Sequence, residues 1–130
     1  MHSRYQKRLL LQSRAVFMIG SHAGEGRLLN INGTGGLIES PVHVYRGDYV
    51  PLKLFLPGLP SPLVVTLAAV RWNHGNQFGV EFIQLPQKEQ QVMRQFLAQY
   101  PDLSTRRRRR HYSSDPGGQN WHLDTYRLTA

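Results

Sequence analysis

The sequence has no cysteine among its 130 residues. Disulfides, thiolate-bound metals and thiol catalysis are therefore excluded. It also lacks an apolar run long enough to span a bilayer, since the longest mainly apolar stretch, Leu63–Val70, is short and interrupted by Thr66. The basic start of the chain is not followed by an apolar stretch of signal-peptide length. We therefore expect a soluble, cytoplasmic protein without a transmembrane segment.

Patterns that carry catalysis or bind metals are also scarce. The six histidines show no metal-ligand spacing, and the eight carboxylates form no pair with an obvious common face. No lysine follows the glycine-rich stretch 33–36, so it is not a Walker-type phosphate loop. The sequence thus predicts a protein that is not an enzyme, has no catalytic residues, and holds neither a metal nor a cofactor.

Acidic residues are too few to balance the basic ones, and the net charge is +8. The excess is concentrated at the end of the chain, where residues 105–130 contain six arginines and two aspartates. Five of these arginines are consecutive, at Arg106–Arg110. A basic protein favours anionic partners such as nucleotides, nucleic acid or acidic lipid, but the run is equally compatible with a solvated tail.

Short runs of alternating polarity predict six strands separated by turns, at 14–19, 26–33, 37–39, 50–56, 63–72 and 78–82. The period then changes after Pro86, where apolar residues recur at helical spacing and Pro101 ends the pattern. The expected fold class is all-β: a closed or partly closed six-stranded antiparallel β-barrel followed by one C-terminal α-helix. We expect residues 1–103 to form this domain and residues 104–130 to be a basic, flexible tail.

Two segments carry candidate binding residues. Arg4 and Arg8 precede the first strand, and a guanidinium group can pair with phosphate oxygens or with the O6/N7 edge of guanine. Asn30 and Asn32 alternate with Leu29 and Ile31, so we expect the two amides on one strand face and the two apolar residues on the other. An amide offers both a donor and an acceptor to a base edge. Glycines follow, at Gly35 and Gly36 among others, and allow close backbone approach.

Together these segments resemble the PilZ family of bacterial proteins, whose signature is RxxxR, a strand, (D/N)xSxxG, a six-stranded barrel and a C-terminal helix. Arg4 and Arg8 match the first motif, Asn30 matches the acidic-or-amide position, and Gly35 matches the closing glycine. The resemblance covers roughly residues 4–100. Asn32 stands where the family has serine, and a longer turn lets Gly36 compete with Gly35 for the closing position.

The resemblance implies a cytoplasmic receptor for the second messenger cyclic di-GMP. Arg4 and Arg8 would wrap over the phosphates and guanines of an intercalated ligand pair, while Asn30 and Asn32 would read guanine edges. The output would be a changed surface offered to a downstream protein. From their place on a strand near the same sheet, we add Arg71 and Trp72 as residues that flank the ligand.

Two alternatives remain open at this point. One is a degenerate PilZ-like adaptor that contacts proteins without binding the nucleotide, which the replacement of serine by Asn32 favours. The other is a barrel that binds nucleic acid through Arg106–Arg110. The body of the chain has no obvious row of aromatic residues interleaved with basic ones, which argues against nucleic acid as the partner.

Overall fold

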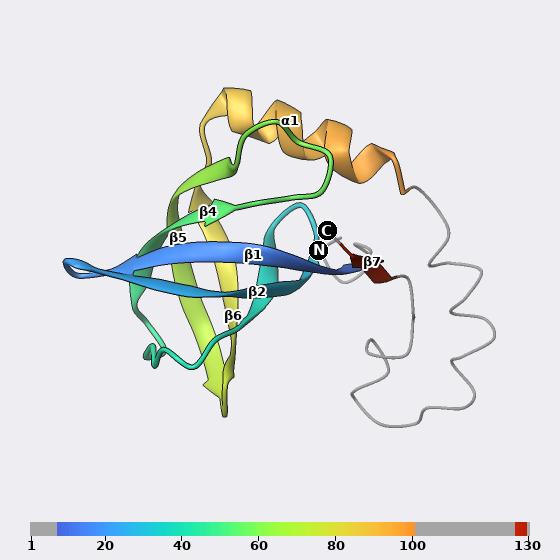
Figure 1. Ribbon diagram of the computed structural model, residues 1–130. Helices are drawn as coiled ribbons and strands as arrows, with labels where there is room; N and C mark the ends of the chain where they lie inside the picture. The colour runs from blue at the N-terminus through green and yellow to red at the C-terminus, as the bar shows by residue number, and fades with distance from the viewer. Residues whose placement is uncertain (1–7, 101–126, 130) are drawn as a thin grey trace.

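The computed structural model describes residues 8–100 and 127–129. Six antiparallel strands close into a barrel, and one helix lies against it (Figure 1). The strands are β1 (Leu9–Ile19), β2 (His22–Ile31), β3 (Gly35–Glu39), β4 (Tyr49–Leu54), β5 (Leu63–His74) and β6 (Gln77–Gln84). The helix α1 spans Gln87–Ala98, and a short strand β7 follows at Arg127–Thr129.

The barrel closes because β2, the first strand in the order of the sheet, pairs with β1 as well as with β3. The strand order is β2-β3-β6-β5-β4-β1-β7, and an additional pairing of β2 with β1 joins the two sides. All pairings among the first six strands are antiparallel, whereas β7 adds to β1 in parallel. The prediction of a six-stranded antiparallel barrel with a C-terminal helix is confirmed.

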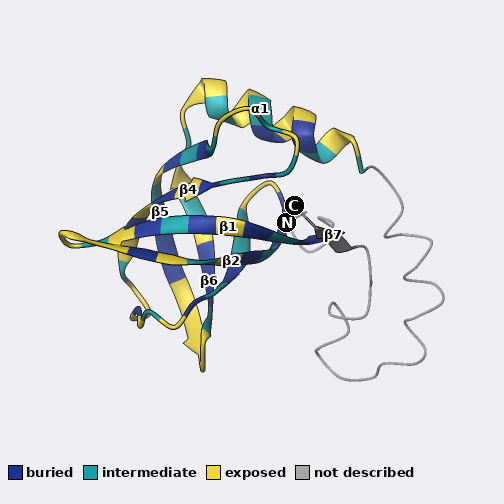
Figure 2. Ribbon diagram, viewed as in Figure 1, coloured by how far each residue is buried: buried dark blue, intermediate teal, exposed yellow. Residues whose placement is uncertain are grey.

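The core is built from the inward-facing residues of each strand, as the burial colours of Figure 2 show. In β4, Val50, Leu52 and Leu54 are buried while the residues between them are exposed. The rings of Phe17 and Phe78 meet edge to face, with centroids 5.3 Å apart, near the middle of the barrel. This regular alternation explains why period-two reading located most of the strands.

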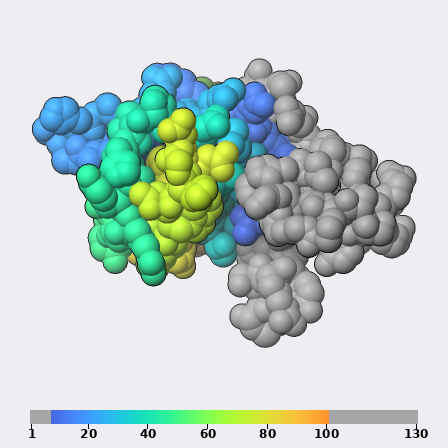
Figure 3. All heavy atoms as spheres, turned by 90° about the horizontal axis from the view of Figure 1, so that it is seen from below, coloured from blue at the N-terminus to red at the C-terminus, as the bar shows by residue number. Residues whose placement is uncertain are grey.

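The helix α1 contributes Met93 and Phe96 to the same core. Its first turn is tied to the barrel, because the Glu89 carboxylate accepts a hydrogen bond of 3.0 Å from the backbone N–H of Val64. The far side of the barrel is held by the chain between β3 and β4, whose Val44 carbonyl accepts a 2.7 Å hydrogen bond from the Asn73 side chain. Figure 3 shows this side of the molecule, with the β3–β4 connection beside the β5–β6 hairpin.

The first strand begins earlier than predicted, at Leu9 rather than at Arg14. Its opening residues Leu9–Leu11 are all buried, so this part of the strand shows no alternation. The cause is a bulge: Leu10 pairs with Asn30 and Ser13 with Leu28, so two residues of β1 lie opposite one of β2. A local irregularity of this kind hides a strand from period-two analysis.

A second irregularity lies at Leu29 in β2. It changes which side chains of this strand face the core from what regular alternation predicts. Leu28 pairs with Ile38 and Asn30 with Leu37, so β2 has one extra residue relative to β3. Leu28 is fully buried in the core, and Leu29, which was expected to share a face with Ile31, is only partly buried. Beyond the bulge, Ile31 faces the core instead.

The part of the chain predicted as a tail contributes a strand. Arg127–Thr129 form β7, which the sequence reading did not predict. The first hairpin turn is also shorter than expected, because β2 already begins at His22 and only Gly20 and Ser21 connect it to β1. Arg106–Arg110 lie outside the described residues.

Within residues 8–100 and 127–129, we find no helix whose length and apolar character would suffice to cross a membrane.

Candidate functional site

One hollow of about 500 Å³ on the outside of the barrel brings the predicted site residues together. It lies where the start of β1, the turn from β2 to β3, and the strands β5 and β6 meet. We call it the Trp72 hollow; its lining consists of Arg8, Asn30, Asn32, Thr34, Gly35, Gly36, Leu37, Arg71, Trp72, Gly79, Val80 and Glu81. Every predicted site residue that the structure describes is in this set. Arg4 lies outside the described residues.

Asn30 is the most unusual residue of the hollow. It is 1% exposed, and its side-chain oxygen Oδ1 is buried with no hydrogen-bond partner among residues 8–100 and 127–129. Its orientation depends on the bulge at Leu29: Gly24 and Leu28 face the core before the bulge, and Ile31 faces it afterwards. Asn30 is thereby turned away from the apolar core and lines the hollow. A buried acceptor without a partner is costly unless another molecule donates to it.

The side-chain oxygen of Asn32 is bonded within its own turn. Asn32 follows β2, and its Oδ1 accepts hydrogen bonds from the backbone N–H of Thr34 (2.9 Å), the Thr34 hydroxyl (3.0 Å) and the N–H of Gly35 (3.1 Å). A backbone bond from Asn32 N–H to the Gly35 carbonyl, 3.0 Å long, closes the same turn. This is an Asx-type turn. A base edge would therefore have to compete with three hydrogen bonds of the turn for the Oδ1 of Asn32.

The two candidate closing glycines both line the hollow, and each is packed too closely for a side chain. A Cβ on Gly35 would overlap the backbone carbonyl of Val80 on β6. A Cβ on Gly36 would come within 2.8 Å of the Asn30 carbonyl and 2.9 Å of the Leu28 side chain. Both glycines therefore allow β3 to fit between β2 and β6, and the backbone forms part of the hollow's floor.

Trp72 provides the aromatic surface of the hollow. It lies opposite Gly79 in the β5–β6 pairing and keeps 42% of its surface exposed. Its indole ring rests on the glycine, because a Cβ there would come within 2.6 Å of Cε2. An exposed indole fixed in this way presents a face on which a planar base can stack.

The charges of the hollow are two arginines and one glutamate. Arg71 occupies the irregular position between Val70 and Trp72, and its guanidinium is 2.7 Å from the Glu81 carboxylate. Arg8 is exposed just before β1. Sequence reasoning missed Glu81 and Thr34. Glu81 could have been found from its place on the outward side of the Phe78–Phe82 alternation, whereas nothing in the sequence distinguished Thr34.

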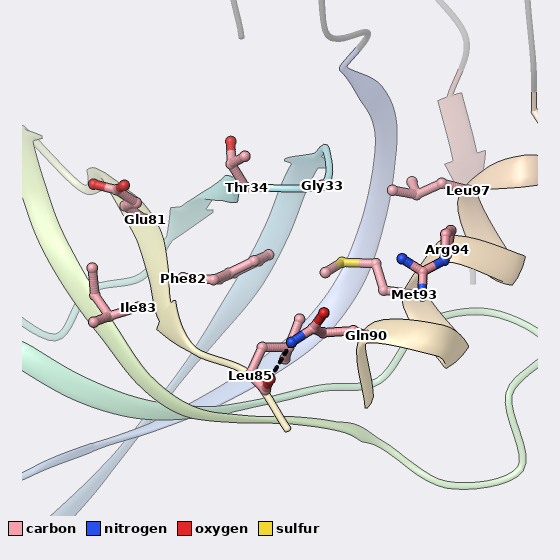
Figure 4. Close-up of a pocket in the computed structure, with 10 residues that line it drawn as sticks. All are labelled: Gly33, Thr34, Glu81, Phe82, Ile83, Leu85, Gln90, Met93, Arg94 and Leu97. Atoms are coloured by element: carbon pink, nitrogen blue, oxygen red, sulfur yellow. Dashed lines mark hydrogen bonds between the residues drawn. The ribbon is translucent and has the colours of Figure 1, made fainter. Parts of the chain in front are cut away.

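A second hollow of about 390 Å³ lies beside the first, between α1 and β6 (Figure 4). We call it the helix hollow; it is lined by Gly33, Thr34, Glu81, Phe82, Ile83, Leu85, Gln90, Met93, Arg94 and Leu97. Thr34 and Glu81 line both hollows. The Thr34 carbonyl accepts a 2.8 Å hydrogen bond from the N–H of Phe82, so the β2–β3 turn is attached directly to the floor of the helix hollow.

The arrangement is suited to binding a ligand. Among the residues that the structure describes, no cluster of three or more His, Asp or Glu side chains could hold a metal ion. What the Trp72 hollow offers is a stacking face, an unpaired amide oxygen, exposed guanidinium groups and close backbone. Groups of these kinds can contact an anionic, planar ligand through stacking and charge-assisted hydrogen bonds.

The comparison with protein families identifies the class of protein. The profile of the PilZ domain matches residues 2–99 of the chain. The protein therefore belongs to the PilZ domain family, and the resemblance predicted from the arginine, asparagine and glycine motifs is confirmed.

Solved structures with the same fold include other PilZ proteins. YcgR from Escherichia coli in complex with c-di-GMP aligns with a TM-score of 0.62 and 10% identity, over 86% of this chain and 50% of that one. The PilZ domain of YcgR with c-di-GMP aligns at 0.61 and 9% identity, over 88% and 99%. The Bacillus subtilis inhibitor of motility MotI/DgrA gives 0.61 and 17%, over 76% and 51%.

At sequence identities of 9–17%, the structural similarity to these proteins establishes the fold alone. The chain covers about half the length of the YcgR complex and of the MotI/DgrA structure. None of the curated proteins compared with it matches the chain.

Proposed function

We propose that this protein is a receptor for cyclic di-GMP, which binds in the Trp72 hollow and changes the surface that the protein offers to a partner protein. The observation that carries the proposal is the side chain of Asn30. The residue belongs to the lining of the Trp72 hollow, and its buried Oδ1 accepts no hydrogen bond from the residues that the structure describes. Guanine carries N–H donors on its Watson–Crick edge, and one of them would satisfy this oxygen. The PilZ fold and the c-di-GMP complexes of YcgR support the same ligand.

The other residues of the hollow then take complementary roles. The exposed face of Trp72 stacks on a guanine, and the glycines Gly35 and Gly36 let the ligand approach the backbone. Arg8 and Arg71 pair with the phosphates or with the O6/N7 edge of guanine. Arg4, which lies outside the described residues, belongs to the same proposal as the second arginine of the RxxxR motif.

The output of binding follows from the turn that separates the two hollows. A ligand that contacts Asn32 or Gly35 acts on Thr34, whose carbonyl is bonded to Phe82 on the floor of the helix hollow. A shift of this turn alters the surface between α1 and β6. In this proposal the protein works by a change in the population of surface states and carries out no reaction.

One observation favours the alternative of an adaptor that does not bind the nucleotide. The Oδ1 of Asn32 is already committed to three hydrogen bonds within its own turn. A position that the family uses for contact with the ligand thus stabilises the protein backbone instead. In this alternative the same barrel contacts a partner protein permanently, without a nucleotide signal.

Calorimetric titration with cyclic di-GMP tests the proposal. A micromolar dissociation constant corresponds to about −8 kcal/mol. Loss of one charge-assisted arginine contact, about 1.5–3 kcal/mol, makes Arg8→Ala bind about tenfold or more weakly. The matched control is Arg14→Ala, because Arg14 is also exposed on β1 but pairs with Glu25 outside the hollow.

The proposal holds if the unmodified protein binds, Arg14→Ala binds equally well, and Arg8→Ala binds weakly. An equal loss in both arginine variants would indicate a general effect of net charge rather than a site. If the unmodified protein shows neither heat nor a thermal shift at high ligand concentration, the receptor proposal is wrong. The alternative of an adaptor that does not bind the nucleotide is then favoured.

A further inference from the structure

The C-terminal strand β7 is attached next to the candidate ligand site. Leu10, Leu11 and Gln12 of β1 pair in parallel with residues 127–129 of β7 (Figure 1). On its opposite edge, Leu10 pairs with Asn30 of β2. The start of β1 is therefore held between β7 and the strand that carries the unpaired amide of the Trp72 hollow.

The barrel itself leaves this edge of β1 open. The neighbouring strand β4 pairs with β1 only at Ala15–Phe17. An open strand edge presents unpaired backbone donors and acceptors, and β7 satisfies those of residues 10–12. Residues in an end segment paired on one side fray more readily than those paired on both.

Arg8 depends on this segment for its position. It directly precedes Leu9, which pairs with Ile31 at the beginning of β1, and it lines the Trp72 hollow. If the start of β1 frays, Arg8 leaves the hollow together with its backbone. The fraction of molecules in which Arg8 is in place therefore depends on the pairing of β1 with β7.

We propose that β7 is a positioning element of the ligand site, which holds the start of β1, and with it Arg8, in the arrangement that binds the nucleotide. This inference rests on the proposed function, and it assigns the end of the chain to the same site. Apparent affinity falls in proportion to the population of the competent state. Because coupling is reciprocal, bound nucleotide must in turn stabilise the pairing of β7 with β1.

The test uses the full chain with cyclic di-GMP as the ligand. Leu128→Pro removes a backbone N–H from the middle of β7 and disrupts its pairing, whereas Leu128→Ala keeps the backbone intact and serves as the matched control. A third variant replaces Arg106–Arg110 by glutamine, which removes the charge of the run and leaves β7 unchanged. Affinity is measured by calorimetry, and the backbone exchange of residues 9–13 by hydrogen–deuterium exchange.

We expect Leu128→Pro to bind cyclic di-GMP about three- to tenfold more weakly, corresponding to a competent fraction of roughly 0.1–0.3. Leu128→Ala should bind like the unmodified protein. Exchange at residues 9–13 should be faster in Leu128→Pro without ligand, and the nucleotide should slow it in the unmodified protein.

Equal affinities of Leu128→Pro and the unmodified protein would overturn the inference about β7. The proposed receptor function would not be affected. An equal loss of affinity in Leu128→Ala would also overturn the inference. Loss of affinity only in the glutamine variant would assign the effect to charge and refute the role of β7. If the unmodified protein does not bind cyclic di-GMP, the proposed function fails and this inference fails with it.

Discussion

The indole of Trp72 rests directly on Gly79, its partner across the β5–β6 pairing. The absence of a side chain at Gly79 fixes the height of the ring above the sheet. Gly79→Ala places a Cβ within 2.6 Å of the present position of Cε2, so the ring must move. Because Trp72 is 42% exposed, it can move outward without disrupting the core.

We therefore expect Gly79→Ala to bind cyclic di-GMP more weakly than the unmodified protein. The loss of affinity should be smaller than that expected for Trp72→Ala. Base–aromatic stacking contributes about 1–3 kcal/mol by alanine substitution. The indole N–H resonance of Trp72, followed by NMR during titration, reports whether the ring contacts the ligand. If Gly79→Ala binds like the unmodified protein, the position of the Trp72 ring above Gly79 does not matter for binding.

Asn30→Leu should affect stability and binding in opposite directions. It replaces a buried amide, whose oxygen has no partner, with an apolar side chain of similar size. Stability is expected to be unchanged or to rise by up to about 1 kcal/mol in urea unfolding. Cyclic di-GMP binding should be lost, and a variant that is destabilised but still binds would contradict both expectations.

Asn32→Ala should destabilise the protein by about 1–3 kcal/mol, since the turn loses the acceptor of three hydrogen bonds. Asn32→Asp retains that oxygen and should unfold near the midpoint of the unmodified protein. The aspartate also adds a negative charge to a hollow that we propose for an anion, so its cyclic di-GMP affinity should fall. Equal thermal midpoints for Asn32→Ala and Asn32→Asp would show that the turn does not depend on Oδ1.

Glu81→Gln should strengthen cyclic di-GMP binding a fewfold. The Glu81 carboxylate lies 2.7 Å from the Arg71 guanidinium and competes with an anionic ligand for it. Both side chains are about half exposed, so loss of the ion pair should change stability by less than about 1 kcal/mol. Titrations at two salt concentrations should show a steeper salt dependence for Glu81→Gln, and unchanged affinity would mean that Arg71 does not contact the ligand.

The sequence was sufficient to predict the barrel because most of its strands alternate cleanly, as β4 does at Val50, Leu52 and Leu54. It was insufficient where the backbone departs from regular pairing. The bulge of β1 opposite Leu29 hid the start of that strand. The extra residue Leu29 in β2 put Leu28 in the core and left Leu29 only partly buried. The strand β7 was missed because three residues paired through their backbone leave no pattern in the side chains.

The sequence predicted several of the residues that line the candidate site, but it did not predict how their side chains are hydrogen-bonded. The PilZ motifs and strand positions predicted Arg8, Asn30, Gly35 and Trp72, which the structure brings to one hollow. No pattern in the sequence shows that Asn32 is bonded within its own turn while Asn30 has a free acceptor. Both features depend on the local path of the backbone between β2 and β3.

The bulge at Leu29 has a practical meaning for anyone who wishes to move this site to another barrel. If Leu29 were instead part of a regular strand, the alternation that places Gly24 and Leu28 inward would point Asn30 into the apolar interior as well. Grafting the same sequence onto a regular hairpin would turn the Asn30 amide into the apolar core and the Ile31 side chain outward. The transferable unit is therefore the side chains together with the irregular backbone at Leu29.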